Sequence, residues 1–233
     1  MSELEKKGLV PTLRFPEFRG EGEWDVKPLG HMYSFVTTNS LSREKLNYVD
    51  GIVRNIHYGD IHTKFSTLFD IEKESVPFIN LTESLQNIKP EAYCIEGDIV
   101  FADASEDLDD IGKTIEIVNL SNQKVLSGLH TLLARQKEKN IIIGFGGYLF
   151  KSNIIRKQIQ KESQGAKVLG ISATRISKID IHFPCHKEQQ KIADCLSSID
   201  DLITAQSKKI DTLKAHKKGL MQQLFPAMDE TGT

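Results

Sequence analysis

The most acidic part of the sequence is the segment 103–110, DASEDLDD, whose carboxylates are closely spaced. Carboxylates can bind Mg²⁺ or Ca²⁺, and Asp or Glu can accept a hydrogen bond from cytosine N4 in the major groove of DNA. The spacing matches no EF-hand loop, and no Glu-X-Lys sequence follows that would suggest a nuclease. We therefore favour a turn whose carboxylates accept hydrogen bonds from backbone N–H groups. Base contacts by Ser105 and Asp107 are the alternative, and no metal site is predicted.

A second group of polar and aromatic side chains surrounds a predicted strand and turn. It comprises His57, Tyr58, His62 and Lys64. Such side chains can contact phosphates or base edges, but they are equally typical of an exposed strand. His130 and Thr131 follow Gly128, which would let the backbone approach a partner closely. For these two residues, DNA contact and a hydrogen-bonded core position are equally good interpretations.

Positive charge is concentrated between Lys151 and Lys178, although the whole chain carries a formal net charge of −2. The overall balance gives no reason to expect nucleic acid, so any DNA contact must come from local patches. Arg156, Lys157 and Lys161 are explained as the solvent-exposed face of a helix predicted over residues 147–162. Phosphate contact is the better interpretation for the residues after that helix, which are Lys167, Ser172, Thr174 and Arg175.

Catalytic motifs are missing from the sequence. It contains no Asn/Asp-Pro-Pro-aromatic motif of an adenine methyltransferase, no Walker loop and no nucleophile in a recognisable setting. The glycine-rich segment 144–147, GFGG, lacks a following acidic partner and is interpreted as a turn. We therefore expect a non-catalytic chain that binds no cofactor of its own.

Cysteine use and hydropathy indicate a compartment. Cys94, Cys185 and Cys195 are odd in number and form no Cys-X-X-Cys pair, which indicates reduced thiols without zinc. The N-terminus is too charged for a secretory signal, and the longest apolar run is too short to span a bilayer. We expect a cytoplasmic protein that does not contact a membrane.

The chain divides into an arm, a packed domain, a long helix and a tail. Residues 1–23 form the arm, 24–184 the domain, 185–226 the helix and 227–233 the tail. Within the domain, short β-type runs alternate with turns, and the predicted strands are 52–61, 76–81, 93–102, 114–119, 125–134 and 176–183. One amphipathic helix is predicted over 147–162, with Leu149, Ile154, Ile155 and Ile159 facing inward. The predicted fold is a mixed α/β domain with a largely antiparallel sheet, followed by a coiled-coil helix.

The long helix carries an apolar stripe with alternating steps of four and three residues, the spacing of a coiled-coil seam. The seam positions are Ile192, Leu196, Ile199, Ile203, Gln206, Ile210, Leu213, Lys217, Leu220 and Leu224. Pro184 and Pro226 punctuate the two ends. Self-association is favoured over packing against the chain's own domain, because the rhythm persists for more than four heptads. Gln206 would fix the register, whereas Lys217 would reach solvent.

These segments, in this order, resemble the specificity subunits of type I restriction–modification systems. The resemblance rests on PTLRFPEFRGEGEWDVKPLG (11–30), IHYGDIHTKF (56–65), EGDIVFADASEDLDDIGKTIEI (96–117), LSGLHTLLAR (126–135) and GISATRISKIDIHFPCHKEQQKIADCLSSIDDLI (170–203). Cys185 stands where the family usually has Ser or Thr as a helix cap, with Glu188 three residues on. The chain is similar to half-length members, with one target-recognition domain and one helix.

The resemblance implies a division of labour. Full-length members carry two recognition domains, each reading one half of a bipartite DNA target, and two antiparallel spacer helices. They hold modification subunits that bind S-adenosylmethionine and methylate adenine, and a restriction subunit can join. For this chain the resemblance implies recognition of double-stranded DNA and pairing with a second copy through the helix. The alternative is a non-catalytic coiled-coil adaptor without DNA readout.

Overall fold

The computed structural model describes residues 8–165 and 167–225. The chain divides into two compact units, Met1–Lys191 and Ile192–Thr233. Part of the predicted arm, residues 1–7, lies outside the described residues, as do Pro226 and the predicted tail 227–233.

In the part of the first unit that the structure describes, there are thirteen named strands. They are β1 Asp25–Pro28, β2 Tyr33–Val36, β3 Leu46–Asn47, β4 Val53–Ile56, β5 Leu68–Asp70, β6 Phe78–Ile79, β7 Ile99–Ala102, β8 Ala104–Ser105, β9 Thr114–Asn119, β10 Lys124–Ser127, β11 Thr131–Gln136, β12 Leu169–Gly170 and β13 Asp180–Phe183. The helices are α1 Leu29–Met32, α2 Tyr58–Thr63, α3 Gly146–Lys151, α4 Asn153–Glu162, α5 Ala173–Ile176 and α6 His186–Leu224. Short 3-10 helices cover Pro16–Phe18, Arg43–Lys45 and Pro90–Ala92.

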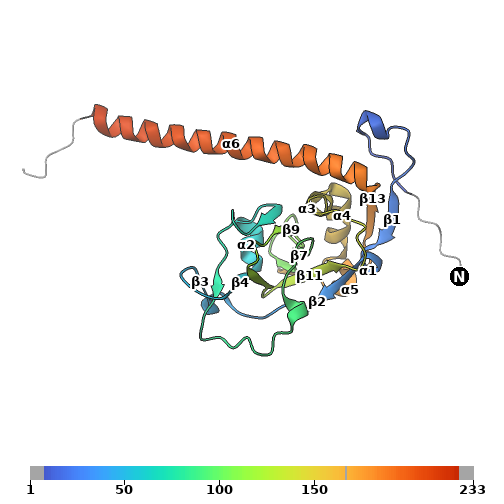
Figure 1. Ribbon diagram of the computed structural model, residues 1–233, viewed down its shortest axis with the longest axis horizontal. Helices are drawn as coiled ribbons and strands as arrows, with labels where there is room; N and C mark the ends of the chain where they lie inside the picture. The colour runs from blue at the N-terminus through green and yellow to red at the C-terminus, as the bar shows by residue number, and fades with distance from the viewer. Residues whose placement is uncertain (1–7, 166, 226–233) are drawn as a thin grey trace, which may run out of the picture. The chain divides into compact units, whose positions relative to one another are not determined.

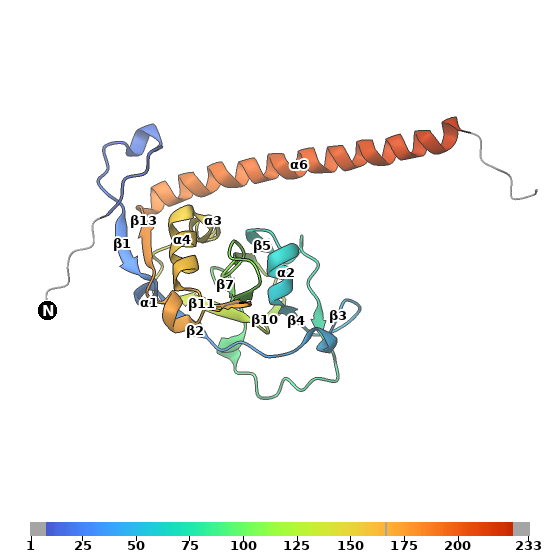
Figure 2. The same ribbon diagram turned by 180° about the vertical axis from the view of Figure 1, so that it is seen from behind.

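Two sheets form the centre of the first unit. One has the order β2-β11-β7-β9-β5 and the other has the order β10-β4-β6-β3. Among the described strand pairs, β10 with β4 and β5 with β9 run parallel, and the others run antiparallel. The mixed, largely antiparallel α/β fold predicted from the sequence is therefore confirmed. In Figure 1 and Figure 2, α3 and α4 lie on one side of β7, β9 and β11, and α2 and β4 lie on the other.

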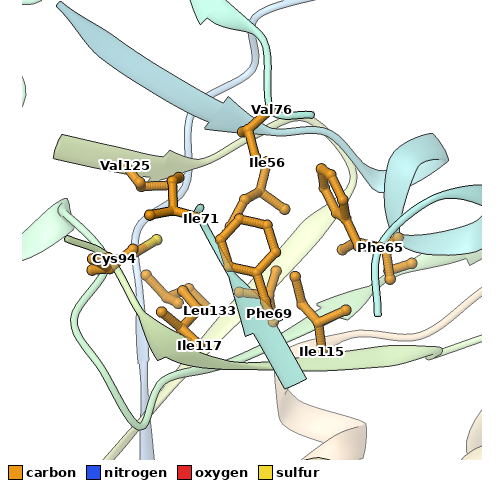
Figure 3. Packing of buried hydrophobic residues seen from close by; sticks show 14 residues of the cluster. Ile56, Phe65, Phe69, Ile71, Val76, Cys94, Ile115, Ile117, Val125 and Leu133 are labelled. Carbon is orange, nitrogen blue, oxygen red and sulfur yellow. The ribbon is translucent and has the colours of Figure 1, made fainter. Parts of the chain in front are cut away.

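The main hydrophobic core fills the space between the two sheets and α2, as Figure 3 shows. Strands β7 and β9 alternate their side chains between two faces, as the two-residue strand period requires. Val100 of β7 and Ile115 and Ile117 of β9 point into this core. Phe101 points to the opposite face and meets the ring of Phe150 in α3, with ring centroids 5.2 Å apart. Buried on both faces, β7 is apolar along its whole length.

Most predicted elements are shorter or divided in the structure. The predicted strands 76–81, 93–102 and 176–183 are reduced to β6, β7 and β13. The predicted strand 52–61 ends at Ile56, because α2 begins at Tyr58. The predicted strand 125–134 is split into β10 and β11 by a turn. The predicted helix 147–162 is broken at Ser152, whose extended backbone separates α3 from α4. This break also explains why Ile154, predicted to face inward, is 37% exposed.

The carboxylate of Glu116 is buried between β9 and α3. Its Oε2 accepts a hydrogen bond from the N–H of Gly147 at 2.7 Å. A Cβ added at Gly146 would lie 3.2 Å from Glu116 Oε1, so the glycine pair gives this carboxylate its room. The segment 144–147 therefore turns the chain and also provides the space that the carboxylate of Glu116 occupies. Its acidic partner precedes it in the sequence instead of following it.

The N-terminal arm is attached to the beginning of α6. Strand β1 pairs antiparallel with β13, which places Asp25 opposite Phe183. Beyond this pair, Arg14 donates to both carboxylate oxygens of Glu188, at 2.8 and 2.7 Å. Glu188 is 1% exposed. The residue predicted to complete a capping box is thus held by an arginine from the arm.

Of the second unit, the structure describes the remaining part of α6 and Phe225. Several seam side chains are exposed in the single chain, including Ile203 at 57% and Leu213 at 57%. Within residues 8–165 and 167–225 we find no helix with the length and apolar character that crossing a bilayer requires.

We predict that Glu116 makes the protein less stable as pH rises. Burial raises the pKa of Glu116 to about 7 from 4.5, and the hydrogen bond from Gly147 opposes part of this rise. The folded state therefore holds the proton more tightly than the unfolded state, and stability falls between pH 4.5 and about 7. The pKa difference between the folded and unfolded states corresponds to a loss of about 3 kcal/mol in the free energy of unfolding. Glu116→Gln should remove this pH dependence and be more stable than wild type above pH 7.

Urea unfolding of both proteins from pH 4.5 to 8 measures the effect, with the exposed Glu106→Gln as the matched control. Parallel stability curves for wild type and Glu116→Gln would contradict the assignment.

Candidate nucleic-acid interface

The segment predicted as a strand and turn around His57 is the beginning of a helix. His57 is 7% exposed, and its Nδ1 accepts a hydrogen bond from the N–H of Gly59 at 3.2 Å. It is therefore the N-terminal cap of α2. Burial, and next to it the charge of Arg43, lowers the pKa of His57. These observations correct the interpretation of His57 as a surface contact.

A buried aspartate organises basic side chains beside this helix. Asp60 is 1% exposed, accepts a hydrogen bond from Arg43 at 2.7 Å and forms an ion pair with Lys64 at 3.0 Å. Lys64 also donates to the hydroxyl of Tyr48 at 3.0 Å. The cations are partly exposed, with side-chain exposure of 43% for Arg43 and 49% for Lys64. Two polar groups that the sequence did not single out, Arg43 and Tyr48, thus join the predicted Lys64.

Aromatic side chains connect α2 to the turn before β11. The ring of Tyr58 lies edge-on to His130 at 5.2 Å and to His62 at 6.0 Å between centroids. The Nε2 of His62 lies 3.0 Å from the carbonyl oxygen of Ala104, to which it donates a hydrogen bond. The predicted residues Tyr58, His62 and His130 are therefore neighbours, although 72 positions separate the first from the last.

The turn between β10 and β11 presents His130 and buries Thr131. His130 has a φ of 55°, in the left-handed region that few residues other than glycine adopt. Its Nδ1 lies 3.2 Å from Asp103 Oδ1. Thr131 is 3% exposed and its hydroxyl hydrogen-bonds Ser127 at 2.7 Å. Of the two interpretations drawn from the sequence for this residue, the hydrogen-bonded core position fits and the DNA contact does not. A Cβ at Gly128 would lie 2.4 Å from the side chain of Asn55. The glycine therefore lets the backbone approach β4 of the same chain closely, and this explains the glycine without a partner.

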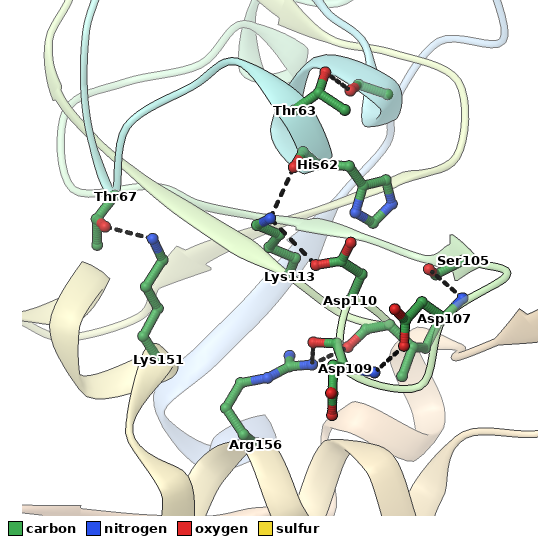
Figure 4. A network of polar contacts seen from close by, with 12 residues as sticks. His62, Thr63, Thr67, Ser105, Asp107, Asp109, Asp110, Lys113, Lys151 and Arg156 are labelled. Carbon is green, nitrogen blue, oxygen red and sulfur yellow. Dashed lines mark hydrogen bonds and ion pairs between the residues drawn. The ribbon is translucent and has the colours of Figure 1, made fainter.

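The acidic segment 103–110 folds as a compact turn (Figure 4). Ser105 Oγ accepts from the N–H of Asp107 at 3.0 Å, and Asp107 Oδ1 accepts from the N–H of Asp109 at 2.9 Å. These are the bonds of the turn favoured from the sequence. Lys113 donates to Asp110 at 3.2 Å and to the carbonyl oxygen of His62 at 2.7 Å, which fastens the turn to α2.

Arg156, on α4, fastens the same turn from the other side. It donates to the carbonyl oxygens of Asp109 at 3.0 Å and Ile111 at 2.6 Å. Its assignment to a solvated helix face is therefore wrong, because the guanidinium satisfies backbone acceptors. Among the described residues, His, Cys, Asp and Glu side chains do not gather in threes or more in a way that could hold a metal ion.

An open groove of about 580 Å³ lies where β8 pairs with β12. Asp103, His130, Ser172 and Arg175 are among the residues that line it. Ser172 caps α5 by accepting from the N–H of Arg175. Arg175 donates to the carbonyl oxygen of Glu162 at 3.0 Å. Lys167 and Thr174 are exposed in the same part of the chain.

The described contacts thus link most of the predicted residues into one surface, which we call the α2–groove face. It runs from Tyr48 and Lys64 through α2 and His130 to the groove. Asp103 belongs to it but was not among the residues singled out from the sequence. The carboxylate lies within the acidic segment, but its partner His130 follows 27 positions later, and sequence spacing did not reveal this pair.

The chain is similar to specificity subunits of type I restriction enzymes. The putative type I restriction enzyme MjaX specificity subunit of Methanocaldococcus jannaschii is 28% identical over 210 residues, covering 87% of this chain and 45% of the relative. The MjaVIII specificity subunit of the same organism is 32% identical over 98 residues, covering 42% of this chain and 23% of the relative. The chain spans less than half the length of these curated relatives.

Solved structures share the fold. The S subunit of a type I restriction–modification system from M. genitalium superposes with a TM-score of 0.62 at 13% identity, over 93% of this chain and 49% of that one. The HsdS subunit of Thermoanaerobacter tengcongensis gives a TM-score of 0.50 at 15% identity, over 86% and 42% of the two chains. Independently, a family model matches residues 21–215. With a match over most of its length, this chain belongs to the type I restriction–modification DNA specificity domain family.

Proposed function

We propose that the first unit reads one half of a bipartite DNA target within a type I restriction–modification complex. The observation that carries this proposal is the α2–groove face. It combines partly exposed cations, aromatic rings and hydroxyl groups from segments distant in sequence. Phosphate contacts position a protein on DNA and side chains at base edges specify sequence. We assign residues 24–184 to recognition and residues 185–226 to the spacer helix.

The other components of the complex supply the chemistry. We propose that the chain docks modification subunits, which bind S-adenosylmethionine and methylate adenine, and that a restriction subunit joins through the complex. The chain itself would remain non-catalytic and without a cofactor.

The spacer helix is proposed to pair antiparallel with a second copy. The steps along its seam read the same from either end, so an antiparallel pair sets Ile192 against Leu224 and Gln206 against Ile210. Charge supports the same direction. Residues 192–206 contain three aspartates and no lysine or arginine, whereas residues 207–224 contain five lysines and one aspartate. An antiparallel pair brings opposite charges together, and a parallel pair would bring like charges together.

An adenine-methylation map of a methylation-free host tests the proposed function. The host would express this chain with a modification subunit of the same system, and each protein alone as a control. We expect a bipartite, palindromic motif only when both are present, because a two-fold protein reads two-fold DNA. An asymmetric motif would contradict pairing of identical copies, and no methylation by soluble, co-purifying proteins would contradict the recognition role.

A charge reversal at Lys167 separates DNA binding from scaffolding. Lys167→Glu should weaken binding to all DNA sequences alike and lower the salt dependence of log Kd by about one. The matched control is Lys139→Glu, because Lys139 is also exposed but lies outside the α2–groove face. Titration at several salt concentrations measures both quantities. Unchanged DNA binding with intact self-association would favour the adaptor alternative.

Charge reversal in the helix tests its direction. Lys214→Glu with Lys218→Glu should weaken self-association at low salt by roughly tenfold, since each exposed pair contributes about 0.2–1 kcal/mol. Adding Asp200→Lys and Asp201→Lys should restore it. Sedimentation velocity in low and high salt measures the change, with Ile203→Asp as a variant that disrupts the seam at any salt. Tighter association of the first double variant would indicate a parallel pair.

A further inference from the structure

The pair of Asp103 and His130 lies in the groove of the α2–groove face with both side chains partly exposed. The side chains are 27% and 51% exposed, and Asp103 Oδ1 lies 3.2 Å from His130 Nδ1. Both residues line the groove together with Ser172 and Arg175. If the first unit reads DNA as proposed, a base edge that enters the groove would meet this pair.

The backbone holds this pair at both ends. The N–H of Asp103 donates to the carbonyl oxygen of His130 at 3.0 Å, and the N–H of Ile171 donates to the carbonyl oxygen of Asp103 at 2.9 Å. The ring edge of Tyr58 packs against the imidazole at 5.2 Å between centroids. The imidazole is therefore supported from the backbone, from a carboxylate and from an aromatic ring.

The conformation of His130 determines where its side chain points. Its φ of 55° lies in the left-handed region, in which histidine is enriched among the residues other than glycine. A histidine here projects a large polar side chain from a tight turn into the groove.

The carboxylate fixes which atom of the ring is free. An ionised carboxylate only accepts hydrogen bonds, so the Nδ1 of His130 carries a proton and donates it to Asp103. In the neutral ring the other nitrogen, Nε2, is then an acceptor. Asp103 would be repelled by a DNA phosphate, so the pair suits a base edge better than the backbone.

Exocyclic amino groups are the hydrogen-bond donors of the major groove, on adenine N6 and cytosine N4. We propose that His130 accepts a hydrogen bond from one such amino group and so specifies one base pair of the half-site, with Asp103 as the positioning residue that orients the ring. This inference rests on the proposed function and adds the chemical group that is read.

The test is a double-mutant cycle between His130 and the DNA. The complex with its modification subunit binds duplexes that carry the mapped motif. In these duplexes each adenine of the half-site in turn is replaced by purine, which lacks N6, each cytosine by 2-pyrimidinone, which lacks N4, and each guanine by 7-deazaguanine, which lacks N7. His130→Gly removes the side chain while keeping the left-handed backbone, because glycine adopts this conformation without strain.

We expect wild type to lose roughly tenfold in affinity on one of these analogues. His130→Gly should show the same loss on unmodified DNA and no further loss on that analogue. Asp103→Ala should lose part of the discrimination, and Asp103→Asn should restore it, because the amide oxygen can still accept from Nδ1. His31→Ala, an exposed histidine on α1, should bind like wild type.

Independent losses at every position would overturn the inference while leaving the proposed function intact. Coupling to 7-deazaguanine instead would overturn the acceptor assignment, since guanine N7 requires a donor. A wild-type complex that shows no preference for the motif would overturn the proposed function and this inference with it.

Discussion

The pairing of β1 with β13 is the constraint on which the rest of the architecture depends. These strands come from opposite ends of the first unit, yet Asp25 lies opposite Phe183. Their pairing brings the arm to the beginning of α6, where Arg14 reaches Glu188. A buried carboxylate without its partner would carry a large desolvation cost. The ion pair and the strand pair therefore depend on each other, and together they attach the beginning of α6 to the first unit.

Buried charges stabilise the fold of the first unit, whereas partly exposed charges lie on the surface proposed to contact DNA. Asp60 and Glu188 are almost fully buried, and each is paired with arginine or lysine from another segment. They fix the positions of α2 and of the arm. The charges and polar groups of the α2–groove face are instead partly exposed, as for Lys64 and His130. Asp60 thus stabilises the position of α2 and also orients Arg43 and Lys64, whose side chains are partly exposed. The stability of α2 is therefore linked to the surface proposed to contact DNA.

The sequence predicted what depends on local pattern and missed what depends on distant partners. Periodicity identified the mixed fold and the long helix, because alternation and heptads are local properties. It extended a strand through His57, because a histidine cap is not among the common N-terminal signals. It could not foresee that Glu116 would fill the space left by Gly146 and Gly147, since their contact requires the tertiary fold. For the same reason Asp103 was read only as part of an acidic run.

The net charge of −2 bears on how such a chain could read DNA at all. Phosphate contacts supply much of the affinity of DNA-binding proteins, and here the cations of the α2–groove face are few and partly committed to Asp60 and Glu162. One copy would therefore bind weakly and depend on base contacts for what affinity it has. A helix that joins two copies makes the second contact intramolecular and raises its effective concentration. Under the proposed function, two weak half-sites joined by the spacer helix would discriminate by both sequence and separation, because neither half would bind strongly enough alone.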